Sequence, residues 1–172
     1  MARLPYPDLT KPEIAPIAER IKAERGGKML NLYHMLLHSP PVADGWRAFL
    51  TAIRQQCQLS GRARELAILR VAVLNGADYE FNAHTSFAKK EGVTQAQLDE
   101  MRADRVPADF TAADRAVLDC TDAMTRHIQV PDAVFNEVKK HFPDRDAMEL
   151  VATIAAYNLV SRFLVAIQVD HE

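Results

Sequence analysis

Glu80 and His84 are the residues of this chain whose types and spacing best suit acid–base chemistry. They lie four residues apart in the segment GADYEFNAH, after a glycine turn signal and before an apolar helical pattern, so they share one face of a helix. A carboxylate and an imidazole in this arrangement can pass a proton between them and to a substrate. Two explanations stay open: an acid–base site, or a helix end where Glu80 complements the dipole and His84 is a core residue.

The elements around this pair are predicted to be helices almost throughout, so the predicted fold class is all-α. Ser60 is predicted to cap a helix that stops at Gly76, and Asp78 to cap the helix that carries the pair. Capping boxes are predicted at Thr10 with Glu13 and at Thr94 with Gln97, because a hydroxyl residue precedes Glu or Gln by three positions in both.

The last helix is predicted to be capped by Asp144, to run to about Asp170 and to be apolar on nearly all sides over residues 147–169. Such a helix cannot present one wet face along its whole length. Glu149 and Arg162 within it argue against a membrane span. We therefore expect a central helix that a neighbouring copy of the chain completes, which makes the protein a homo-oligomer.

Composition excludes several classes of function. The chain has 172 residues, enough for one domain with a substantial core, and its 21 basic and 23 acidic residues give a net charge of −2. This balance gives no positive electrostatic field that would attract a polyanion, so no nucleic-acid partner is expected. The first residues lack the apolar stretch of a signal peptide, which predicts a cytoplasmic protein without a membrane partner. Cys57 and Cys120 are the only cysteines and form no C-x-x-C pair.

Residues 62–93, RARELAILRVAVLNGADYEFNAHTSFAKKEGV, resemble the signature of the carboxymuconolactone decarboxylase family, which includes the alkylhydroperoxidase D-like peroxidases. Residues 149–167, ELVATIAAYNLVSRFLVAI, resemble the closing helix of that family. The resemblance implies an alkylhydroperoxidase D-like all-α fold with two similar helical halves, assembled into oligomers. We expect one domain over residues 1–172, with an N-terminal extension at 1–29, a first half with the site at 30–101 and a second half at 108–172.

The peroxidase branch of the family has a Glu, a C-x-x-C pair and a His four residues after the second Cys. Here the Glu matches Glu65 and the His matches His84, but Ala77 and Glu80 occupy the cysteine positions. A thiol peroxidase needs a thiolate and a resolving thiol, and neither side chain can supply one. Peroxidase activity of that type is therefore not expected.

The form with Tyr79, Glu80 and His84 resembles the decarboxylase branch instead. The resemblance implies loss of CO₂ from a small carboxylated lactone, with Glu80, His84 and Glu65 as the catalytic candidates. That reaction stabilises a carbanion and then protonates it, and it needs no cofactor. Two alternatives stay open: an alkylhydroperoxidase or peroxiredoxin-like antioxidant, and a noncatalytic helical oligomer that binds a small molecule.

The distance of Glu65 from the pair depends on how two helices cross. In a level antiparallel hairpin turning at Ala77, Glu65 would lie ~18 Å from the turn and His84 ~10 Å, at about 1.5 Å per residue. Direct contact then requires a steep crossing, a neighbouring subunit or a bridging water. The alternative is a structural ion pair of Glu65 with Arg64, Arg70 or Arg162.

Weaker candidates complete the predicted site. Tyr79, Trp46 and Tyr33 are the aromatic residues predicted to line a substrate pocket or the core. His34 and His38 have a spacing that suits a metal, but His38 precedes Ser39-Pro40 and fits a helix end better, so no metal is predicted. A weak internal repeat aligns Glu65 with Glu149 and places the carboxylate–imidazole pair in the first copy alone.

Overall fold

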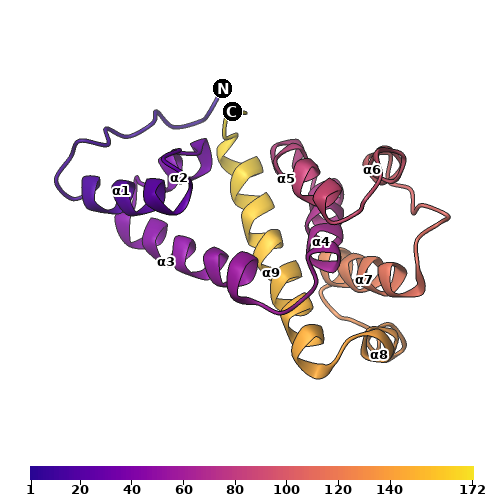
Figure 1. Ribbon diagram of the computed structural model, residues 1–172. Helices are drawn as coiled ribbons and strands as arrows, with labels where there is room; N and C mark the ends of the chain where they lie inside the picture. The colour runs from indigo at the N-terminus through magenta and orange to yellow at the C-terminus, as the bar shows by residue number, and fades with distance from the viewer. The chain divides into compact units, whose positions relative to one another are not determined.

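The protein, described over residues 1–172 by a computed structural model, is all-α as predicted, with no strand (Figure 1). The α-helices are α1 (Ala15–Glu24), α2 (Asn31–Leu36), α3 (Pro40–Thr51), α4 (Gly61–Leu74), α5 (Asp78–Lys90), α6 (Gln95–Arg102), α7 (Ala112–Asp122), α8 (Asp132–His141) and α9 (Asp144–Ile167). Two π-helical segments, η1 (Ala52–Gln56) and η2 (Ala123–His127), extend α3 and α7.

The chain forms two compact units. The first comprises Met1–Gln56 with Leu164–Glu172, and the second comprises Cys57–Phe163. In the first unit α1 and α2 pack against α3, and the two chain ends are joined where the Ala2 amide donates to Asp170 at 3.1 Å. The division into halves predicted from the internal repeat rests on sequence similarity and stays a prediction.

In the second unit α4 packs against α5 and α7, and α7 packs against α8 (Figure 1). Eight consecutive residues of α4, from Glu65 to Ala72, are buried. Helices on several sides therefore cover α4, in agreement with its apolar and Ala-rich sequence. Because a buried charge must be paired, Glu65 and Arg70 within this run each require partners from neighbouring helices.

Several predicted helix signals are confirmed. The Ser60 hydroxyl accepts a hydrogen bond from the Ala63 amide at 3.2 Å and caps α4. Gly76 has a φ of +62°, a left-handed conformation that glycine adopts without steric cost, and it ends α4. The capping box of Thr94 and Gln97 is present at the start of α6.

Three predicted helix starts are wrong, and one of them is Asp144, which is the first residue of α9 rather than its cap. Thr10 does not cap α1, which begins at Ala15. Pro16 inside a longer helix would remove a hydrogen bond and clash with the preceding turn, so it lies in the first turn instead. Asp78 is the first residue of α5 rather than its cap, and the capping position is Ala77. The Asp78 carboxylate there complements the positive end of the helix dipole.

Helix α9 is less enclosed than predicted. By length and composition it is apolar enough to span a bilayer, and half of its most apolar stretch is buried. Met148, Leu159 and Val165 are exposed in the single chain. Burial on all sides is therefore not reached within one copy, and completion by a neighbouring copy stays a prediction.

Candidate active site

His84 lies between two carboxylates in the second unit. Its Nδ1 donates to Glu65 Oε2 of α4 at 2.6 Å, and its Nε2 lies 3.0 Å from Glu80 Oε1 of its own helix α5. All three side chains are buried, with 2%, 4% and 3% of Glu65, Glu80 and His84 exposed. The predicted residues therefore meet in one buried carboxylate–imidazole–carboxylate cluster.

The chain reversal between α4 and α5 brings the cluster together. The Ala77 amide donates to the Ala72 carbonyl at 2.8 Å across the left-handed Gly76, and this bond closes the end of α4. The direct contact of Glu65 with His84 contradicts a level hairpin. Two helices that cross at an angle can bring together residues at different distances from the turn.

Glu65 has a second partner, so both explanations offered for it hold in part. Arg64 Nε donates to Glu65 Oε1 at 3.3 Å, while the other oxygen accepts from His84. Arg70 binds aspartates instead, and Arg162 donates to the side-chain oxygen of Asn158 at 2.6 Å. Glu65 is therefore held on both oxygens, which fixes the orientation of the carboxylate that faces the imidazole.

The cluster shifts the protonation of its members. Burial alone would lower the pKa of His84, but the hydrogen bonds and negative charges of Glu65 and Glu80 outweigh it and raise that pKa. Burial alone would raise the pKa of Glu65, yet the hydrogen bond from His84, with the charges of His84 and Arg64, lowers it. Both directions favour an imidazolium beside an ionised Glu65.

Sequence reasoning missed Tyr157 of α9. Its hydroxyl lies 3.3 Å from His84 Nε2, its ring meets the imidazole edge-on with centroids 5.2 Å apart, and it is 2% exposed. A usable signal was present, because a buried tyrosine hydroxyl requires a polar partner and Tyr157 interrupts an otherwise apolar segment.

The predicted aromatic candidates are not all in the same unit. Tyr79 is half-buried at the second position of α5, next to Glu80. Trp46 and Tyr33 are buried in the first unit, where the Arg25 guanidinium lies 4.0 Å from the centre of the Tyr33 ring. Substrate contact by these three residues stays a prediction.

The two weakest candidates have structural partners. His34 and His38 bind the carbonyl oxygens of Pro7 and Pro5 through Nε2, at 2.8 and 2.7 Å. These contacts fasten the N-terminal segment to α2 and the turn after it. The bonds engage one nitrogen of each ring in a structural role.

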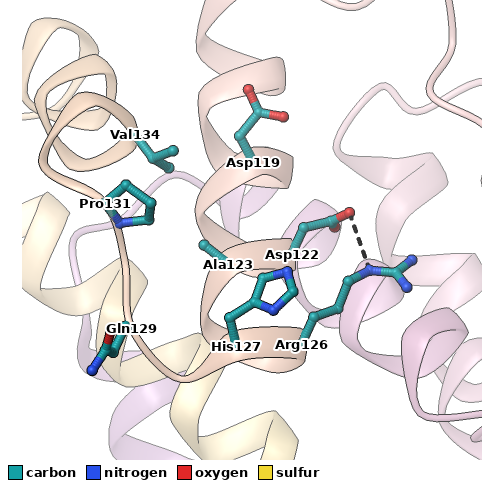
Figure 2. A pocket seen from close by; sticks show the side chains of 8 residues that line it. All are labelled: Asp119, Asp122, Ala123, Arg126, His127, Gln129, Pro131 and Val134. Atoms are coloured by element: carbon teal, nitrogen blue, oxygen red, sulfur yellow. Dashed lines mark ion pairs between the residues drawn. The ribbon is translucent and has the colours of Figure 1, made fainter.

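A separate surface pocket of about 530 Å³ lies beside α7, η2 and the start of α8 (Figure 2). Asp119, Asp122, Arg126 and His127 are among the residues that line it, and it contains none of the predicted catalytic residues. Arg126 Nε lies 3.7 Å from Asp122 Oδ2, the pair that Figure 2 marks. Arg70 also donates to Asp122, so two guanidinium groups that do not titrate near neutral pH engage this carboxylate.

Comparison with known proteins supports the family resemblance. A model of the carboxymuconolactone decarboxylase family matches residues 40–123. An uncharacterized protein of Bacillus subtilis (strain 168), YdfG, is 26% identical over 114 residues, which cover 65% of this chain and 78% of YdfG. Residues 40–123 of this chain are thus similar to the carboxymuconolactone decarboxylase family, and the chain has no C-x-x-C pair.

Solved structures confirm the alkylhydroperoxidase D-like helical fold. An uncharacterized peroxidase-related protein from Ralstonia eutropha JMP134, described as an alkylhydroperoxidase AhpD core, matches with a TM-score of 0.84 and 22% identity, covering 99% of this chain and 92% of that one. A peroxidase-related protein from Silicibacter sp. TM1040 matches with a TM-score of 0.81 and 20% identity, over 99% and 90% of the two chains. The debrominase Bmp8, as a cysteine-to-alanine variant in complex with 2,3,4-tribromopyrrole, matches with a TM-score of 0.79 and 16% identity, over 100% and 94%.

Proposed function

We propose that this protein is a cofactor-independent enzyme that decarboxylates, or transfers a proton to, a small carboxylated substrate of the lactone type. The observation that carries the proposal is the placement of His84 between Glu65 and Glu80, with contacts of 2.6 and 3.0 Å in a buried setting. A buried proton shared between an imidazole and a carboxylate suits general acid catalysis. The match of residues 40–123 to the model of the carboxymuconolactone decarboxylase family supports the same class of reaction.

The proposed reaction begins when the substrate loses CO₂ and the electrons of the broken C–C bond remain on the substrate carbon. The proton on His84 Nε2 passes to Glu80, which delivers it to that carbon and forms the new C–H bond. Glu65 keeps the other ring nitrogen protonated and holds the ring in place. Water then returns one proton to His84 Nε2, and the hydroxide that remains combines with the released CO₂ to form bicarbonate.

The thiol-peroxidase alternative finds no support in the two cysteines. Burial and the negative charge of Glu149 raise the pKa of Cys57. Burial raises the pKa of Cys120 to about 11. A reactive cysteine requires a lowered pKa and access to solvent, and these thiols have the opposite shift.

The test combines a ligand screen with two substitutions. Small lactones and dicarboxylates are screened by thermal shift, and those that bind are assayed for release of CO₂. Glu80→Gln and His84→Asn are each expected to lower turnover by ~10²–10⁴-fold, a far larger effect than their effect on the melting temperature. Since the two residues act in one step, the double variant should resemble the worse single variant.

Matched controls come from the exposed helix α8, where Glu137→Gln and His141→Asn change the same residue types away from the cluster. Both controls should retain turnover. A stability loss in the Glu80 and His84 variants with turnover intact would identify the cluster as structural and contradict the proposal.

The proposal includes the cellular compartment, the assembly state and the class of partner. The enzyme acts in the cytoplasm as a homo-oligomer in which a second copy covers the exposed apolar residues Met148, Leu159 and Val165 of α9. Its partner is a small molecule, without nucleic acid or membrane. Light scattering on purified protein tests the assembly, and a monomer at micromolar concentration contradicts it.

A further inference from the structure

The Nε2 atom of His84 has two oxygen neighbours from two different helices. Glu80 Oε1 of α5 lies 3.0 Å away and the Tyr157 hydroxyl of α9 lies 3.3 Å away. Nδ1 on the other side of the ring is already bonded to Glu65. A ring nitrogen either donates one proton or accepts with one lone pair, so the protonation of Nε2 decides which neighbour it binds.

Each protonation state has a different best partner. A protonated Nε2 donates to the Glu80 carboxylate, because a charged acceptor forms the stronger hydrogen bond. After the pair has delivered its proton, Nε2 carries a lone pair and faces an ionised Glu80, which has no hydrogen to donate. The Tyr157 hydroxyl is then the neighbour that can donate to Nε2, and it is within reach without movement of the backbone.

We propose that Tyr157 is a positioning residue whose hydroxyl donates to His84 Nε2 in the state that follows proton delivery to the substrate. The inference rests on the proposed acid–base function. In the delivery step the Nε2–H bond breaks, the proton passes through Glu80 to the substrate carbon, and Tyr157 keeps its own proton. Water supplies the proton that restores Nε2–H and returns the imidazole to Glu80.

Among the groups that face His84, Tyr157 is the one placed to donate a hydrogen bond to Nε2. From α4, Glu65 accepts from Nδ1 and Arg64 binds the far oxygen of Glu65. From α5, the Phe87 ring lies 5.7 Å from the imidazole, centre to centre. The edge-on packing of the Tyr157 ring holds the hydroxyl at Nε2, so removal of the oxygen alone changes the hydrogen bond and keeps the ring contact.

The test is Tyr157→Phe, with nitrogen NMR titration of the His84 ring in the intact protein. Without the donor, the neutral imidazole loses its stabilising bond, so the pKa of His84 should rise above that of the wild type. Turnover should fall by about 3- to 10-fold, the range expected for one neutral hydrogen bond. An unchanged or lowered His84 pKa would overturn the inference.

Tyr6→Phe is the matched control, because it removes one tyrosine hydroxyl that contacts Asp170 in the first unit. It should leave the His84 titration unchanged. If Tyr157→Phe does not fold, 3-fluorotyrosine at position 157 gives a more acidic and stronger donor, which should lower the pKa of His84. A His84 shift in a protein that turns over no carboxylated substrate would support the hydroxyl contact and contradict the proposed decarboxylation.

Discussion

Helix α4 carries two buried charged side chains, Glu65 and Arg70, whose surroundings differ in one chemical respect. Glu65 is bonded at 2.6 Å to an imidazole, which can gain or lose a proton near neutral pH. Arg70 forms a two-pronged pair with Asp122, at 2.6 and 2.7 Å, and a further bond to Asp104 at 2.6 Å. The Arg70 guanidinium, in contrast, keeps its proton at neutral pH.

The two clusters therefore suit different tasks although the same helix supports both. The Arg70 cluster balances fixed charges and ties α4 to the end of α7 and to the segment after α6, which is a structural role. The Glu65 cluster holds an exchangeable proton between two carboxylates in a buried place, which is the arrangement that acid–base chemistry requires. Burial alone does not distinguish the two, whereas the ability of the partner to titrate does.

Of the substitutions that test this comparison, Glu65→Gln has the largest expected effect. Loss of a hydrogen bond to a charged group should lower turnover by about 10- to 100-fold and lower the pKa of His84, because the imidazolium loses one negative neighbour. Kinetics with a pH titration of His84 measures both. An unchanged pH profile would place Glu65 with Arg70 as a structural residue.

Arg70→Met tests the structural role of the Arg70 cluster. It leaves Asp122 without its two-pronged partner, and we expect a loss of about 1–3 kcal/mol in the free energy of unfolding, since Asp122 is partly exposed and keeps Arg126 nearby. Turnover and its pH profile should stay as in the wild type. Urea denaturation gives the stability, with the exposed Arg105→Met as control. A changed pH profile in Arg70→Met would show that the two clusters are coupled.

Glu149, the residue aligned with Glu65 by the internal repeat, has a third kind of partner. Its Oε2 accepts the amides of Gln58 and Leu59 at 2.7 and 2.8 Å, which orders the segment before α4. Glu149→Ala leaves these amides unbonded and should cost about 1–3 kcal/mol of stability with turnover close to normal. Thermal melts and assays of the same samples test it, and a catalytic defect without a stability loss would contradict it.

The stability of the wild type should depend on pH through the Glu65 cluster. The raised pKa of His84 gives stabilisation that is complete below its ordinary pKa of 6.5 and is lost as pH rises through the folded-state pKa. The lowered pKa of Glu65 gives stabilisation that is present above 4.5 and is lost as pH falls through the folded-state pKa. The contribution of this cluster to the melting temperature should therefore be highest between pH 4.5 and pH 6.5. His84→Asn should remove the alkaline decline, and its persistence would assign the decline to another group.

The smallest effect is expected for the thiols. Cys57→Ala and Cys120→Ala, singly or together, should leave turnover on a carboxylated substrate within about 2-fold, because neither thiol has a lowered pKa. Peroxide consumption with a dithiol donor serves as the counter-assay. Thiol-dependent turnover that alkylation abolishes would return the protein to the peroxidase branch.

Local signals in the sequence determined the helices and the identity of the titrating residues. The all-α class followed from helical periodicity, and the stop at Gly76 followed from the conformations that only glycine adopts freely. Glu80 and His84 are one turn apart, so their contact at 3.0 Å is a property of the helix itself. Helix starts were predicted less well where two local signals compete. At Thr10 the capping signal competes with Pro16, which lies in the first turn of α1, and at Asp78 it competes with the favourable position of a carboxylate inside the first turn of α5.

Contacts between helices were decided by the tertiary structure. The sequence indicated Glu65 through family resemblance, but the crossing of α4 and α5 places it at His84 and sends Arg70 to Asp122. Tyr157 of α9 lies 73 residues from His84 along the chain, and the two side chains meet only in the folded protein. Local residue spacing specifies which side chains share one helix face and places Glu80 beside the imidazole. Packing of separate helices specifies which faces meet, and it alone brings Glu65 and Tyr157 to the same ring.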